Sequence, residues 1–167
     1  DYGEVDKGIA VLDLVRLTIH VLFDYTEIHS EEELAEACAK TTQLFAFNDL
    51  RQAGSCDLGT FAFPRVKLAV VAAQRILWLL PGFVESAASA VEGCAAHADY
   101  HPLTFFLVLL ERVLRLLTFT SVDLERQKIW ALRMAVVSTQ QLRDVWSQPP
   151  IVRAPATHQA DKAVSVR

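Results

Sequence analysis

Three side chains that commonly bind zinc stand close together in the second half of the chain. Cys94, His97 and His101 are spaced three and four residues apart in the run Cys-Ala-Ala-His-Ala-Asp-Tyr-His. On one continuous helix this spacing would place a thiolate and two imidazoles on a single face, as a zinc site requires. Pro102 argues against that helix, because the residue before a proline is pushed out of helical geometry. We therefore treat the three residues as weak candidates only and predict neither a metal nor any other cofactor.

The remaining residues with chemical potential match no catalytic pattern. The chain has no Gly-x-Ser-x-Gly motif, and Gly54 and Gly59 lack the lysine and helix start of a phosphate-binding loop. Cys38 is interpreted as a small core residue. Cys56 is interpreted as an inert loop thiol, though it is the cysteine expected to be easiest for solvent to reach. His20 lies on a polar line of its helix and is interpreted as an ordinary, partly exposed histidine. The chain is therefore predicted not to be an enzyme.

Composition indicates the class of protein and of partner. The 167 residues suit one domain, and the apolar share of 52% is slightly above the usual range. A net charge of −4 argues against a nucleic-acid partner. Three widely separated cysteines favour free thiols in a reducing, intracellular compartment over a disulfide framework. The first residue is Asp1 rather than methionine, as expected of a processed chain or an excised fragment.

Hydrophobic periodicity predicts an all-α domain with about six helices. Ser30 and Glu33 form a capping box at the start of the second helix, and Pro64 opens the third. The apolar loop 48–63 is expected to lie against the helices. The domain is predicted to cover residues 1–147, and 148–167 form a flexible C-terminal tail. The predicted helices cover residues 5–25, 30–47, 64–80, 83–98, 102–119 and 121–146.

The fifth predicted helix is apolar on almost every side. A helix of this kind must be surrounded by protein or lipid, so we expect residues 102–119 to be the buried centre of the domain. Glu111 and Arg115 are four residues apart and are expected to pair along its one polar strip. The other helices would pack around this one as a bundle, or as three helical hairpins in an α-solenoid-like stack. No internal repeat favours the stack, and no motif assigns the chain to a family.

These features favour a non-catalytic interaction or scaffold subunit of a larger assembly. The partner would be another protein, or a second copy, bound through apolar helix faces, and the first or third helix is the expected place. The alternative is a helical bundle that binds a lipid or other apolar ligand, either in solution or at a membrane surface. A transmembrane span is not expected, because Glu111, Arg112 and Arg115 each cost roughly 3 kcal/mol at the bilayer centre, more than the apolar residues return. Peripheral membrane contact stays open.

The zinc candidates generate a first prediction. Purified protein should contain no stoichiometric zinc by elemental analysis, because Pro102 interrupts the helix that would hold all three ligands on one face. Stoichiometric zinc that disappears in the His97→Ala variant would contradict this expectation.

Overall fold

The described part of the chain is built from helices alone. The computed structural model describes residues 8–82, 102–118 and 125–147. Within these ranges there is no strand, so the predicted all-α class is confirmed. The predicted helix 83–98, the zinc candidates and the predicted tail lie outside them. The elements are α1 (Gly8–Ile19), the π-helical turn η1 (His20–Asp24), α2 (Glu31–Leu44), the short 3₁₀ turn η2 (Leu50–Gln52), α3 (Pro64–Leu77), α5 (Pro102–Leu117) and α6 (Glu125–Ser147).

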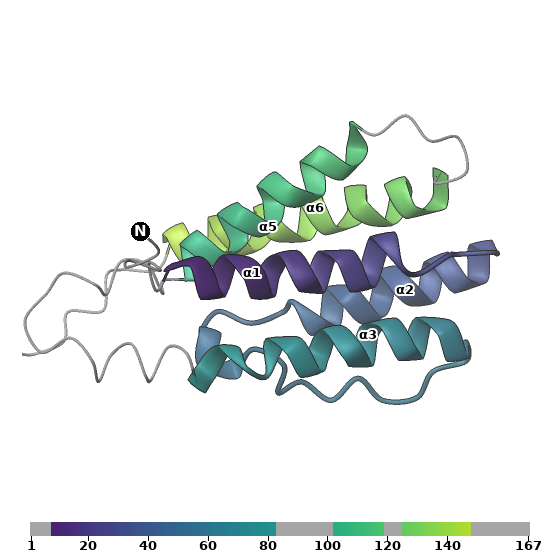
Figure 1. Ribbon diagram of the computed structural model, residues 1–167, viewed down its shortest axis with the longest axis horizontal. Coiled ribbons are helices and arrows are strands. Elements are labelled where there is room, and N and C mark those ends of the chain that lie inside the picture. The colour runs from purple at the N-terminus through teal and green to yellow at the C-terminus, as the bar shows by residue number, and fades with distance from the viewer. Residues whose placement is uncertain (1–7, 83–101, 119–124, 148–167) are drawn as a thin grey trace, which may run out of the picture.

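The five long helices within the described ranges form a closed ring around a shared core (Figure 1). α5 packs along α6 most extensively, and α1 contacts both α5 and α3. α2 closes the ring by contacting both α3 and α6. The described helices are therefore a bundle and not a stack of hairpins. The predicted hairpin of fifth and sixth helices is present, whereas α1 lies between α3 and α5 instead of pairing with α2.

The start of α2 follows the sequence signal closely. Ser30 is in extended geometry and its hydroxyl accepts the backbone N–H of Glu33 at 3.1 Å. The Glu33 carboxylate in turn accepts the backbone N–H of His29 at 2.7 Å, so two otherwise unpaired donors are satisfied. α2 ends at Leu44, three residues before the predicted end. The following residues Phe45 and Phe47 are both buried in the core.

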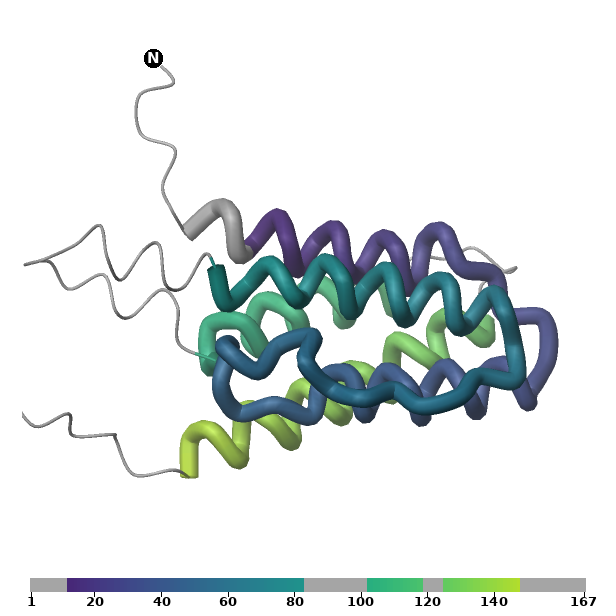
Figure 2. The backbone as a smooth tube through the Cα atoms, turned by 90° about the horizontal axis from the view of Figure 1, so that it is seen from below, coloured from purple at the N-terminus to yellow at the C-terminus, as the bar shows by residue number. Residues whose placement is uncertain are grey.

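The segment between α2 and α3 runs back along the length of the bundle (Figure 2). It lies against the helices as predicted, with Leu50 and Leu58 buried. The Glu36 carboxylate accepts backbone N–H groups near its end, and Gln74 of α3 donates to the Cys56 carbonyl at 2.6 Å. Gly54 has a φ of 75°, and a Cβ there would lie 2.7 Å from backbone atoms of α3. Only glycine fits this close approach.

α5 is not the buried centre of the domain, so this part of the fold prediction is wrong. One face points inward, where Phe105, Phe106, Leu109 and Val113 are buried. On the other side Leu107 is 50% exposed. The physical reason is the ring: its interior is filled by side chains from all five helices and leaves no place for a further helix at its centre. The predicted ion pair between Glu111 and Arg115 is present.

The two faces of α5 give a stability prediction with a matched control. Leu109→Ala should lower the free energy of unfolding by about 2–5 kcal/mol, because Leu109 is 1% exposed and its loss leaves a cavity. Leu107→Ala removes the same atoms from a half-exposed position and should cost about 1 kcal/mol or less. Urea denaturation of both variants measures the difference, and equal losses would contradict this placement of α5.

Candidate functional site

The structure does not place the predicted zinc ligands. Cys94, His97 and His101 all lie outside the described residues, so the expected absence of a metal stays a prediction. In the ranges 8–82, 102–118 and 125–147, no three cysteine, histidine or acidic side chains come together as a metal site would need.

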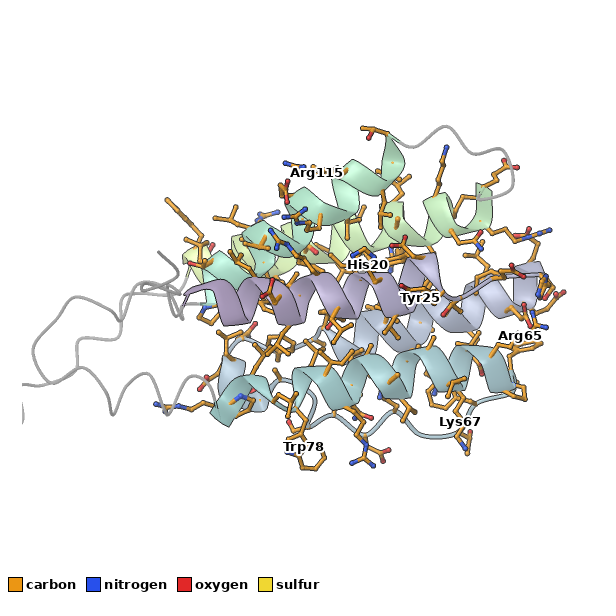
Figure 3. The ribbon with its side chains drawn as sticks, in the orientation of Figure 1. His20, Tyr25, Arg65, Lys67, Trp78 and Arg115 are labelled. Atoms are coloured by element: carbon orange, nitrogen blue, oxygen red, sulfur yellow. The ribbon has the colours of Figure 1, made fainter. Side chains whose placement is uncertain are left out.

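His20 lies on the surface, as the sequence predicts. Its ring nitrogen Nδ1 contacts the Asp24 carboxylate one turn later, and the His20 side chain is 55% exposed. The π-helical turn that contains both residues is closed by a bond of 3.0 Å from the Tyr25 backbone N–H to the His20 carbonyl. Tyr25 is itself 79% exposed (Figure 3). The pair sits on an open surface where water screens its charges, which is unlike the enclosed setting of acid–base catalysis.

The two described thiols are poor nucleophiles. Cys38 and Cys56 are half-buried and pack at the edge of the core. Burial raises the pKa of the Cys38 thiol, and the positive charge of Arg133 only partly opposes this. Burial is also the main cause that raises the pKa of Cys56, against a backbone hydrogen bond that lowers it. Because the thiolate is the reactive form, both groups are held in the unreactive state at neutral pH.

The more distinctive surface is an apolar stripe on α5. Leu107 and Leu114 are 50% and 47% exposed, and Leu110 between them is half-buried. Their spacing of three and four residues puts all three on one side of the helix. These side chains, together with Glu111, Arg115 and Thr118, line an open depression of about 450 Å³. The surface is therefore both apolar and concave.

A second stripe runs along the neighbouring helix α6. Ile129, Leu132 and Val136 are 46%, 54% and 41% exposed. Trp130 faces α2, because its Nε1–H donates to the Thr41 hydroxyl at 3.0 Å. Leu132 is two residues further and therefore about 200° round the helix axis, which turns it away from α2 and the core.

We call the exposed aliphatic side chains of both helices the α5–α6 outer face; they are Leu107, Leu114, Ile129, Leu132 and Val136.

The sequence interpretation missed this face. Leu132 and Val136 are apolar residues of the predicted helix 121–146, and both are exposed. Eight residues of α6 are buried, and among them Trp130, Met134 and Ser138 are spaced four residues apart. Trp130 and Met134 lie on one side of the helix because they are spaced i, i+4, and this spacing was the available signal.

Basic side chains border the α5–α6 outer face. Arg115 directly follows Leu114 and is 68% exposed on the outer side of α5 (Figure 3). Arg133 directly follows Leu132, and its charge reaches Cys38, so it lies on the edge of α6 that is nearer α2. Glu111 contacts both Arg112 and Arg115, so one carboxylate serves two guanidinium groups. The apolar stripes thus lie between two positively charged edges.

Other exposed apolar residues are scattered. On α3, Leu68 is 75% exposed, and beyond its end Trp78 is 60% exposed with Arg75 over its ring at 5.8 Å. Figure 3 shows Trp78 and Lys67 pointing away from the bundle on the side opposite α5. The sequence favoured the first or third helix as the uncovered one, and α3 does expose apolar side chains. They do not form two adjacent stripes as on α5 and α6.

Comparisons with known proteins identify no relative of this chain. No family model matches the chain. No curated protein and no solved structure is significantly similar to it. Among the described helices, none combines the length and the apolar character needed to cross a bilayer.

The raised thiol pKa values predict slow and strongly pH-dependent alkylation. In a Cys94→Ala background, iodoacetamide should modify Cys38 and Cys56 several-fold more slowly at pH 8 in folded protein than in urea. The folded state holds these protons more tightly than the unfolded chain does. The free energy of unfolding should therefore fall as the pH rises above about 8.5. Equal alkylation rates in both states, measured by mass spectrometry, would contradict the assigned burial.

Proposed function

We propose that the chain is a non-catalytic interaction subunit of a larger protein assembly and that it binds its partner through the α5–α6 outer face. The observation that carries this proposal is the pair of adjacent aliphatic stripes on two packed helices. Single exposed apolar residues are ordinary on protein surfaces, whereas a continuous patch that is bordered by polar residues is typical of an interaction site.

The energetics of this face support binding. Full burial of a leucine or isoleucine contributes about 1.5–3 kcal/mol, so covering each half-exposed side chain contributes roughly 1 kcal/mol. Five such residues supply several kcal/mol to the complex, and the two rigid helices that carry them need little reordering. A partner that covered only one of the stripes would gain about half as much.

The interior favours a protein partner over an enclosed apolar ligand. Large side chains from several elements are fully buried at the centre, among them Trp130, Phe45 and Phe105. Phe47 and Phe106 pack at 5.3 Å between ring centroids, and Phe105 and Phe106 at 5.2 Å. These rings occupy the volume that a lipid chain would need. The depression beside Leu107 opens on the surface, where it suits a docked side chain.

The raised thiol pKa values and the solvent-exposed His20–Asp24 pair support a role without catalysis. The raised pKa disfavours the nucleophilic thiolate form of both cysteines, and the His20–Asp24 pair lies on an open surface.

Site-specific photo-cross-linking tests the proposed function. A photoreactive amino acid at Leu132 should give a discrete cross-linked product with one protein in the native cell. The same amino acid at Lys67, on the opposite side of the bundle, should not. Leu132 is 54% exposed, so the replacement leaves the core intact. Identical product patterns from the two positions, or none from either, would contradict the proposal.

A further inference from the structure

We infer that the partner segment on the α5–α6 outer face is an amphipathic helix that carries acidic residues on both sides of its apolar stripe. This inference rests on the proposed function and adds the chemistry of the partner. Shape, charge distribution and the repulsion between two copies of the face each support it.

The shape of the face suits a helix. α5 and α6 run antiparallel and pack side by side (Figure 1). The open depression on α5 is lined by Leu107, Leu110 and Leu114. Leu107 and Leu114 on α5 repeat over seven residues, as do Ile129 and Val136 on α6. Seven residues correspond to two helical turns, or about 10 Å along the axis. A docked helix with apolar residues at positions i, i+3 or i+4, and i+7 would therefore meet both stripes.

The net charge of α5 and α6 indicates the sign of the charge on the partner segment. α5 and α6 together carry six basic and three acidic side chains, a balance of +3. The whole chain is −4, so the remaining sequence carries −7. Basic charge is thus concentrated on the two helices that bear the apolar stripes. Arg115 stands on one edge of the outer face and Arg133 on the other. Carboxylates on both flanks of a docked helix would lie opposite these guanidinium groups.

The same charges argue against a second copy as the occupant. A symmetric dimer through this face would bring together two helix pairs that each have a net charge of +3, with Arg115 and Arg133 at the edges of each face. Like charges across an interface disfavour the pairing, and Glu111 is already shared between Arg112 and Arg115. We therefore place the acidic helix on a different protein. A flat anionic membrane would match the charge but would leave the depression lined by Leu110 unfilled.

Binding of designed peptides tests this inference. The probe is a synthetic helical peptide with leucines at i, i+4 and i+7 and glutamates on both flanks. Its counterpart has lysine in place of every glutamate. By fluorescence anisotropy the full chain should bind the acidic peptide about tenfold more tightly, and added salt should reduce the difference. The double variant Arg115→Glu with Arg133→Glu should reverse the preference, and Arg115→Gln with Arg133→Gln should remove it.

A charge control distinguishes an effect of charge on the α5–α6 outer face from an effect of the net charge of the whole chain. Arg51→Glu with Lys67→Glu changes the net charge by the same amount at exposed positions on η2 and α3. This variant should keep the preference for the acidic peptide. Unchanged far-ultraviolet circular dichroism of all variants would show that the fold is retained.

The remaining outcomes would overturn the inference. Equal affinity for both peptides would mean that charge plays no part. A dimer in light scattering that Leu114→Asp converts to monomer would identify a second copy as the occupant. Binding to phosphatidylserine vesicles without binding to either peptide would identify a membrane surface. If no peptide binds and Leu132 still cross-links to one protein, the acidic helix is wrong and the proposed function stands; if both fail, both are wrong.

Discussion

The indole of Trp130 joins three parts of the helical ring. Its Nε1–H donates to the Thr41 hydroxyl on α2 at 3.0 Å, and Thr41 in turn donates to the Ala37 carbonyl at 2.7 Å. The ring of Phe23, from the π-helical turn after α1, meets the indole edge-on at 4.8 Å. A buried indole N–H without a partner would cost free energy, so this bond fixes how α6 sits against α2. The remaining helices pack against the surface that these three elements form.

The closed ring determines which surfaces are left for binding. Its interior is almost entirely apolar, and buried hydroxyl groups such as Thr18 and Ser138 donate to carbonyls of their own helices. Such a core needs no partner from outside. Each helix contributes one face to it, however, and the opposite face must contact either water or another molecule. On α5 and α6 that opposite face is aliphatic, so the arrangement that completes the core also creates the candidate binding surface.

Sequence reasoning succeeded where the signal is local and failed where it depends on neighbouring helices. The Ser30 cap, the Pro64 start and the Glu111–Arg115 pair involve residues within one turn, and all three are present. The segment 48–63 was also correctly expected to cover the bundle, because its leucines and phenylalanines are too apolar for a free linker.

The position of α5 in the bundle could not be predicted from local sequence. A helix that is apolar all round is compatible with a central location and equally with a peripheral one whose outer face binds a partner. The hydrophobicity of Leu107 and Leu114 is the same in either case. Only the packing of the other four described helices decides between them. The same ambiguity applies to Leu132 and Val136 on α6, because their hydrophobicity alone does not show that they are exposed.

The long return segment between α2 and α3 gives the bundle an electrical polarity. Because it brings the chain back to its starting end, α2 and α3 run in the same direction (Figure 2). Arg126 at the start of α6 pairs with Glu31 at the start of α2, at 3.0 Å, so α6 also begins at this end.

Of the five described long helices, three thus begin at the same end of the bundle. Their aligned peptide dipoles exceed those of the two helices that run the opposite way. The excess equals about half an elementary charge at each end. The acidic first turn of α2 and Glu125 of α6 lie at the positive end. A hairpin connection in place of the return segment would have reversed α3 and changed the sign of this excess.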